Sequence, residues 1–158
     1  MADTVLFLDV DGTLIPFGPG AGPVGDGRTI NPLLARLNPE HGPKLLALGC
    51  TLVWATGWMD EANDEISPRL GLPSLPVVDW PDDDDEETSN GLHWKTRLLV
   101  AWAQRRPFIW IDDEISDIDL AWVADNYPAP ALLHRVESHI GLTDDDLRTV
   151  QRWLATRS

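Results

Sequence analysis

The chain has 158 residues, of which 43% are apolar and 24% charged, the balance of an ordinary globular protein. Its 26 Asp and Glu against 12 Lys and Arg give a formal net charge of −14, which argues against a protein that holds nucleic acid by broad phosphate neutralisation. A single cysteine, Cys50, excludes an intramolecular disulfide. With no signal peptide and no membrane-length apolar stretch, we expect a cytoplasmic protein that does not enter a membrane.

Short apolar runs alternate along the chain with segments that have helical spacing or helix-capping residues. In chain order we predict a strand at residues 4–10, a helix at 39–48, a strand at 51–55, a helix at 60–70, a short strand at 76–79, a helix at 93–104, a strand at 108–111, a helix at 116–124, a strand at 131–136 and a last helix from residue 143. Ser116 is the expected N-cap of one helix, and Thr143 with Asp146 resembles a capping box at the start of the last.

This alternation predicts an α/β fold, a three-layer Rossmann-like sandwich around a mostly parallel sheet of about five strands. We expect residues 1–158 to form one domain. Two segments fit no regular element. Residues 17–28 are rich in Gly and Pro and are expected to form a flap, and residues 81–90 contain six consecutive acids and are expected to form a solvated loop. Ligands of such sheets bind at the carboxyl ends of the strands, where we expect the functional side chains.

Carboxylates follow two of the predicted strands. Asp9 and Asp11 stand in the sequence DVDGT after the first strand, and Asp112, Asp113 and Asp117 follow the strand at 108–111. Neighbouring carboxylates repel each other unless a cation lies between them, and Mg²⁺ prefers oxygen ligands. The acids therefore predict a Mg²⁺ site. The alternatives are solvated loop acids or, for Asp117, a helix N-terminus whose dipole favours negative charge.

Polar residues also follow the strand at 51–55. Thr56 and Gly57 offer a hydroxyl and backbone N–H groups that suit a phosphoryl oxygen, although Thr56 could instead cap the next helix. Trp58 either stacks on a substrate ring or packs against that helix. Lys95, one of two lysines, stands at a predicted helix start, where the helix dipole disfavours a cation. This position indicates that Lys95 binds a phosphate or a carboxylate, with a solvated surface lysine as the alternative.

The order DVDGT, then Thr56, then Lys95, then DD-x-x-x-D resembles the haloacid dehalogenase (HAD) superfamily of phosphatases over residues 5–119. The resemblance implies that Asp9 is the nucleophile, which forms an aspartyl-phosphate, and that Asp11 is the general acid and base. It also implies that Thr56, with Gly57, and Lys95 hold the phosphoryl group.

The same resemblance implies a Mg²⁺ cofactor bound by Asp9, Asp11 and Asp113, with Asp112 or Asp117 in support. Whether Asp112 or Asp113 is the direct ligand stays open at this point.

A second resemblance is narrower. The strings WATGW, WIDDE and GLT, together with Asn63, are similar to small HAD domains found fused to RNA-repair enzymes. Asn63, Trp58 and Asp117 are therefore further candidates for contact with the substrate or with the residues that bind it. The partner is a phosphorylated substrate, a nucleic-acid end or a phosphoprotein, and the net charge of −14 disfavours the nucleic acid.

The gaps between motifs are short. Only 44 residues separate Asp11 from Thr56 and 38 separate Thr56 from Lys95, which leaves no room for the cap domain of larger HAD enzymes. The resemblance thus implies an open site that suits a bulky substrate, or one that oligomerisation covers. Two other functions stay open: a phosphoacceptor signalling module, in which the paired acids come first, and a non-catalytic interaction module on the same fold. Because DVDGT comes first here, we favour the phosphatase.

Overall fold

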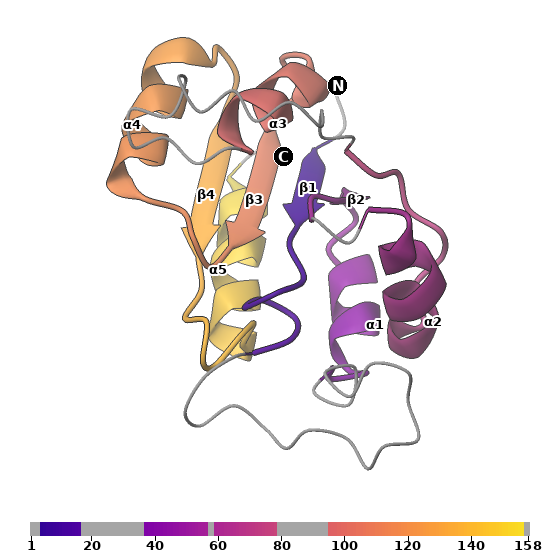
Figure 1. The fold of residues 1–158 in the computed structure, drawn as a ribbon. Coiled ribbons are helices and arrows are strands. Elements are labelled where there is room, and N and C mark those ends of the chain that lie inside the picture. Colours follow the sequence, from indigo (N-terminus) through magenta and orange to yellow (C-terminus); the bar gives the residue numbers. More distant parts are fainter. Residues whose placement is uncertain (1–3, 17–36, 57–58, 79–94, 157–158) are drawn as a thin grey trace.

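The computed structural model describes residues 4–16, 37–56, 59–78 and 95–156. Within these residues, four strands form one sheet in the order β2-β1-β3-β4 (Figure 1). The strands are β1 at Val5–Leu8, β2 at Thr51–Trp54, β3 at Phe108–Asp112 and β4 at Ala131–Arg135. All neighbouring pairs are parallel, and β1 lies at the centre beside β2 and β3. The predicted α/β fold with a parallel sheet is confirmed.

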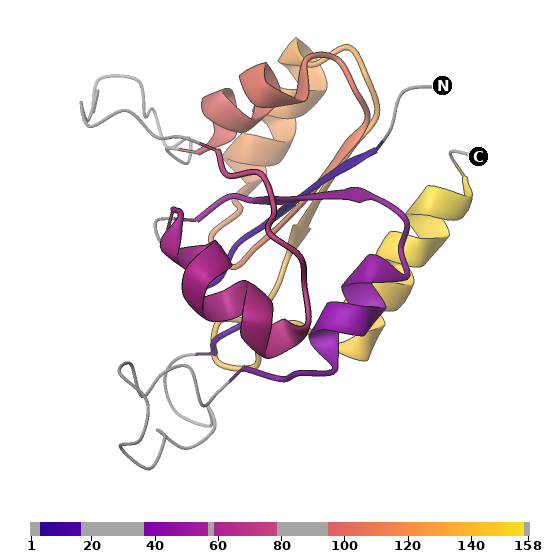
Figure 2. The same cartoon turned by 90° about the vertical axis from the view of Figure 1, so that its right-hand side faces the viewer.

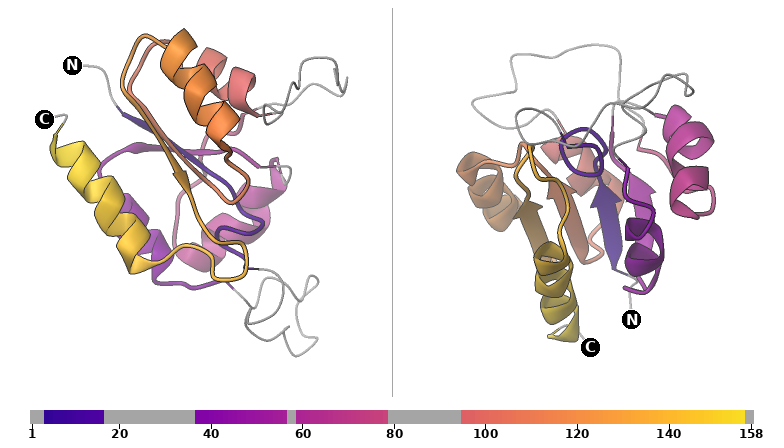
Figure 3. Two further views of the ribbon diagram at one scale, coloured as in Figure 1. Left: turned by 90° about the vertical axis from the view of Figure 1, so that its left-hand side faces the viewer. Right: turned by 90° about the horizontal axis from the view of Figure 1, so that it is seen from below.

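Helices cover both faces of this sheet. They are α1 at His41–Leu46, a π-helical segment η2 at Ala62–Ile66, α2 at Ser67–Leu70, α3 at Thr96–Ala103, α4 at Asp117–Asn126 and α5 at Asp144–Ala155. Figure 2 shows the sheet nearly edge-on, with α3 and α4 on one side and α1, α2 and α5 on the other. Figure 3 shows the same three layers from two further directions. The arrangement is the expected Rossmann-like sandwich.

The central strands are buried on both faces because each face has a helical layer. In β1, Leu6 and Leu8 belong to the core beneath α1 and α5, whereas Val5 and Phe7 belong to the core beneath α3 and α4. All four side chains are completely buried. A strand buried on both faces reads as an unbroken apolar run, which is why residues 4–10 were recognisable from the sequence.

Of the strand predicted at residues 76–79, the described residues 76–78 form no regular strand, so the expectation of about five strands is corrected to four for the part of the chain that the structure describes. Val77 makes an isolated parallel bridge to Trp54, and two backbone hydrogen bonds join Trp54 to Pro76 and Val78. Pro76 has no N–H to donate, so the ladder cannot extend through it.

The helix predicted at residues 60–70 is divided. The π-helical η2 is followed by the short α2, whose second residue is Pro68. In the middle of one long α-helix, Pro68 would remove a backbone hydrogen bond, but at the start of α2 that bond is not needed. The predicted stop at Gly71 is confirmed, since Gly71 adopts a left-handed conformation with φ of 72°.

The side-chain caps predicted at Ser116 and Thr143 are both confirmed. In α4 the Ser116 side chain accepts from the Asp119 N–H, while the Asp119 side chain accepts from the Ser116 N–H. The same reciprocal capping box joins Thr143 and Asp146 at the start of α5.

Several predicted features lie outside the described residues, namely the flap at 17–28, the acidic loop at 81–90, Gly57 and Trp58. Within the ranges that the structure does describe, no helix has the length and apolar character needed to cross a lipid bilayer.

Candidate active site

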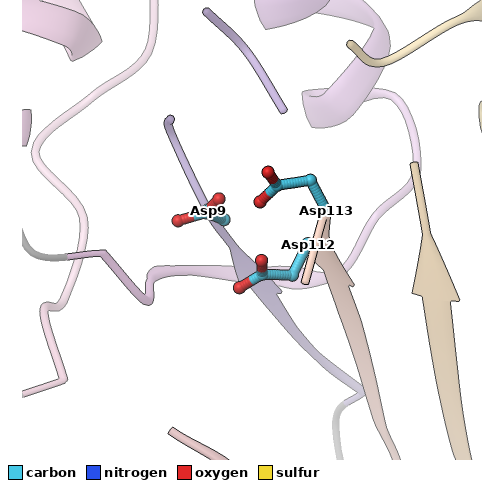
Figure 4. A group of neighbouring side chains, drawn as sticks. All are labelled: Asp9, Asp112 and Asp113. Carbon is cyan, nitrogen blue, oxygen red and sulfur yellow. The ribbon is translucent and has the colours of Figure 1, made fainter. Parts of the chain in front are cut away.

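The carboxyl ends of β1 and β3 bring three acids together. Asp9 directly follows β1, Asp112 is the last residue of β3, and Asp113 comes next. The strands are neighbours, and the Asp9 N–H donates to the carbonyl of Ile111 at 3.2 Å. The carboxylates of Asp9, Asp112 and Asp113 each offer an oxygen within 4.8 Å of the other two, and Figure 4 shows them converging on one space.

A tight turn follows Asp9. The carbonyl of Val10 accepts hydrogen bonds from the N–H groups of residues 13–15. Gly12 has φ of +81°, a left-handed conformation that a residue with a side chain rarely adopts. The turn brings the hydroxyl of Thr13 to 3.3 Å from Asp9 Oδ2, to which it donates. Asp11 lies half-buried in this turn, beside the acid cluster in sequence.

Lys95 lies inside the cluster. It is the N-cap residue of α3 and is only 4% exposed. Its Nζ donates to Asp9 Oδ1 at 2.8 Å and to Asp112 Oδ2 at 2.9 Å. Of the two alternatives for Lys95, a solvated surface position is excluded, because its ammonium group is buried between two carboxylates.

Asp112 is held by donors from the protein itself. Besides Lys95, the indole Nε1 of Trp110 donates to Asp112 Oδ2 at 3.2 Å, and the N–H of Glu114 donates to Oδ1 at 3.0 Å. Both oxygens therefore have partners. The sequence analysis did not predict that Trp110 bonds to Asp112. The signal was available, because residues two positions apart lie on the same face of a strand.

Asp113 differs from Asp112 in its surroundings. Its Oδ1 is buried and has no hydrogen-bond partner among the described residues. A buried acceptor without a donor is destabilising unless a water or an ion satisfies it. The donor set, a largely buried cluster of hard oxygen ligands with one unmatched atom, fits a Mg²⁺ ion.

The charges in the cluster do not balance. Three carboxylates and one ammonium carry a net charge of minus two when all are ionised. Burial raises the pKa of Asp9 to about 8 and outweighs the attraction of Lys95, and burial together with Asp112 raises the pKa of Asp113 to about 7. Burial acts to lower the pKa of Lys95, but Asp9 and Asp112 overcome it and raise that pKa. A divalent cation would supply the missing positive charge and favour the ionised acids.

The remaining predicted residues are placed as follows. Thr56 is buried two residues past the end of β2, and the N–H of its neighbour Ala55 donates to the carbonyl of Leu8, so it lies at the same edge of the sheet as Asp9. Asp117 is exposed in the first turn of α4 and does not belong to the acid cluster.

Asn63 lies in a separate network that joins η2 to the segment after α2. Its Oδ1 accepts from Trp54 Nε1 at 3.0 Å and from the Leu75 N–H at 2.7 Å, and its Nδ2 donates to the Leu75 carbonyl at 2.8 Å. The structure thus gives Asn63 contacts that join η2 to the segment after α2, and its contact with the substrate or with substrate-binding residues stays a prediction.

Comparison with known proteins gave one match. A family model described as "HAD domain in Swiss Army Knife RNA repair proteins" matches residues 5–147, which extend from β1 into the first turn of α5 and include every residue of the acid cluster. Neither the curated proteins nor the solved structures searched gave a match.

Proposed function

The chain belongs to the family of HAD domains in Swiss Army Knife RNA repair proteins, and from that premise we propose that it is a Mg²⁺-dependent phosphatase that acts through an aspartyl-phosphate on Asp9. Membership of a HAD family indicates a hydrolase in general. The observation that carries the more specific proposal is the cluster of buried Asp9 and Asp112 with half-buried Asp113, in which Lys95 directly contacts Asp9 and Asp112.

Asp9 and Asp113 are the side chains that would hold Mg²⁺, together with the backbone carbonyl of Asp11. The unmatched Oδ1 of Asp113 supports this assignment. Asp112 supports the site by holding Lys95. Its Oδ2 accepts from both Lys95 and Trp110 and its Oδ1 from the Glu114 N–H, so among the described residues it has three protein donors where Asp9 has two. When bound, Mg²⁺ supplies positive charge that favours approach of a phosphate to an anionic site and polarises a phosphoryl oxygen.

Asp9 is the nucleophile in this proposal. One of its carboxylate oxygens attacks phosphorus, and the bond from phosphorus to the leaving alcohol oxygen breaks. Water then attacks the phosphorus and releases phosphate, which restores the carboxylate. Dividing the reaction into two displacements allows a weak nucleophile to act, provided it is well positioned. Thr13 and Lys95, which bond to opposite oxygens of Asp9, support that positioning.

The other residues act on protons and on charge. Asp11 gives a proton to the leaving oxygen and later takes one from the attacking water, a role that suits a half-buried acid in the turn after Asp9. Lys95 and Thr56 bind the equatorial oxygens of the phosphoryl group, where negative charge is spread in the transition state.

For the substrate we propose the terminal phosphate of an RNA strand. The family description supports RNA repair as the setting, and the short gaps between the motifs support an open site that a polymer end can enter. The net charge of −14 argues against a long electrostatic grip on the phosphate backbone. The proposed enzyme therefore recognises the end of the strand, and its affinity depends only weakly on the length of the RNA.

A screen of phosphorylated compounds with Mg²⁺ tests this function. It includes nucleotides, sugar phosphates, phosphopeptides and oligoribonucleotides with a 5′- or 3′-phosphate. We expect turnover on one or both oligonucleotide classes with a higher kcat/KM than on an aryl phosphate. Stoichiometric phosphorylation without turnover would instead identify a phosphoacceptor module, and preference for a sugar phosphate would contradict the proposed substrate.

A further inference from the structure

Another buried carboxylate, outside the acid cluster, has no part in the chemistry above. Asp119 in α4 is completely buried. Its Oδ2 accepts from the N–H and the hydroxyl of Ser116, and its Oδ1 accepts from the hydroxyl of Thr96 at 2.7 Å. A carboxylate is buried at a high free-energy cost unless its oxygens have donors, and hydrogen bonds to a charged acceptor are short and strong.

These bonds join two segments that carry the site. Thr96 is the first residue of α3 and directly follows Lys95. Ser116 ends the loop that follows Asp112, the carboxylate that holds Lys95. Asp119 thus fixes the start of α3 to the start of α4, two helices that lie side by side on one face of the sheet (Figure 2).

The capping of α4 does not by itself require the bond to Thr96. The capping box of α5 is a matched case, since Asp146 uses Oδ2 for Thr143 in the same way. Its Oδ1 pairs with Nε2 of His134 in β4 at 2.6 Å, away from α3. In both helices one carboxylate oxygen forms the cap, and the other reaches a different element.

We propose that Asp119 is a positioning residue for Lys95 and acts through the hydroxyl of Thr96. The bond fixes the backbone at the start of α3, and so holds Lys95 Nζ at its distances from Asp9 and Asp112. Without it, the ammonium group samples more positions. The catalytic consequence rests on the proposed phosphatase function, whereas the placement of the ammonium group does not.

The test uses substitutions that separate this bond from the caps. Thr96→Val removes the hydroxyl at nearly constant volume, and Thr96→Ser keeps it. His134→Phe removes the equivalent bond to Asp146 on the other face of the sheet. The chain has only two lysines, so the NMR signals of the side-chain ammonium groups in metal-free protein report Lys95, with exposed Lys44 as the internal reference.

In Thr96→Val we expect the Lys95 signal to shift or broaden beyond detection while the Lys44 signal stays unchanged. In Thr96→Ser and His134→Phe both signals should match those of the unsubstituted protein. With Mg²⁺ and an aryl phosphate, kcat per folded molecule should fall by at least about tenfold in Thr96→Val, as expected when a reacting group is misplaced. In Thr96→Ser and His134→Phe, kcat should stay within about twofold of the unsubstituted value. Thr96→Ser keeps the hydroxyl that bonds to Asp119, and His134→Phe removes only a bond on the other face of the sheet.

An unchanged Lys95 signal in Thr96→Val would overturn the proposal, and so would a Thr96→Ser variant as impaired as Thr96→Val. If Thr96→Val does not fold, Thr96→Ala removes the same hydroxyl without crowding, and the same results are expected. If the unsubstituted protein hydrolyses no phosphate ester, the proposed function fails, but the NMR comparison still decides whether Asp119 positions Lys95.

Discussion

The carboxylate of Asp113 lies directly against the backbone of Gly12. A Cβ atom built on Gly12 would lie 2.2 Å from Asp113 Oδ2 and 2.5 Å from its Cγ, so no larger residue fits there without displacing Asp113. Gly12 stands in the turn after β1, and Asp113 stands in the loop after β3. The missing side chain therefore allows the two acidic loops to approach each other as closely as the proposed Mg²⁺ site requires.

The first prediction is that Gly12→Ala weakens Mg²⁺ binding. The left-handed φ of +81° adds a strain of about 1–2 kcal/mol, and the new methyl group displaces Asp113. Gly71→Ala is the matched control, because Gly71 has φ of +72° but no atom within 4 Å of its Cβ position. Both variants should lose stability in thermal unfolding, and calorimetry should show weakened Mg²⁺ binding in Gly12→Ala alone. Equal Mg²⁺ affinity in the two variants would contradict the role assigned to the contact.

The second prediction separates the two neighbouring acids after β3. Asp113→Asn should lower Mg²⁺ affinity at least tenfold, a loss of about 1.4 kcal/mol. Asp112→Asn should reduce Mg²⁺ affinity less, but lower the free energy of unfolding by about 1–3 kcal/mol, because it disturbs the bonds to Lys95 and Trp110. Exposed Asp117→Asn is the control for loss of charge. If Asp112→Asn weakened Mg²⁺ binding more than Asp113→Asn did, Asp112 and not Asp113 would be the direct ligand.

The third prediction concerns pH. In the metal-free protein the pKa values of Asp9 and Asp113 are about 8 and about 7, above the ordinary 3.8. Protons therefore compete with Mg²⁺ over a range of roughly pH 6 to 8, and Mg²⁺ affinity should rise with pH across it.

In the absence of metal, the free energy of unfolding should change with pH in the opposite direction to the Mg²⁺ affinity. A carboxyl whose pKa is raised by folding contributes stability that is fully present below its unfolded pKa and is lost as pH rises through its folded pKa. The metal-free protein should thus lose the contributions of Asp9 and Asp113 towards pH 8, and Mg²⁺ should raise the unfolding temperature more at pH 8 than at pH 6. A shift of equal size at both pH values, measured by calorimetry, would contradict the competition.

The fourth prediction concerns the packing of α1 against α2. Gly42 lies within α1, and a Cβ atom there would lie 1.7 Å from the carbonyl oxygen of Leu70. Helix propensity alone favours Gly42→Ala by about 0.5–1 kcal/mol. Overpacking against backbone that cannot move aside costs about 1–3 kcal/mol, so the substitution should destabilise the protein in chemical denaturation. A stabilised Gly42→Ala variant would show that the two helices can separate freely.

The sequence was most informative where the physical signal is local. Buried strands are continuous apolar runs, capping boxes have fixed spacing, and the acids at 9 and at 112–113 follow strand ends. The divided helix at 60–70 and the missing strand at 76–79 both depend on proline, whose effect varies with its exact place in an element.

Contacts between distant segments were the part that the sequence could not supply. That Lys95 would bind Asp9 and Asp112, or that Thr96 would bind Asp119, depends on which helix packs beside which. Asn63 shows the same limit, since its partner Leu75 follows a turn whose direction no local pattern fixes. The residue types of the acid cluster were therefore predictable, whereas the different contacts of Asp112 and Asp113 required the structure.

The most direct measurement is phosphate release from an end-phosphorylated oligoribonucleotide by the unsubstituted protein and by Asp9→Asn, each with Mg²⁺ and with a chelator. An amide does not attack phosphorus as a carboxylate does, and Asn keeps the shape of Asp. We expect release only by the unsubstituted protein with Mg²⁺, while circular dichroism shows the same fold in both. Release at a near-normal rate by folded Asp9→Asn, or release that the chelator leaves unchanged, would contradict a Mg²⁺-dependent reaction at Asp9.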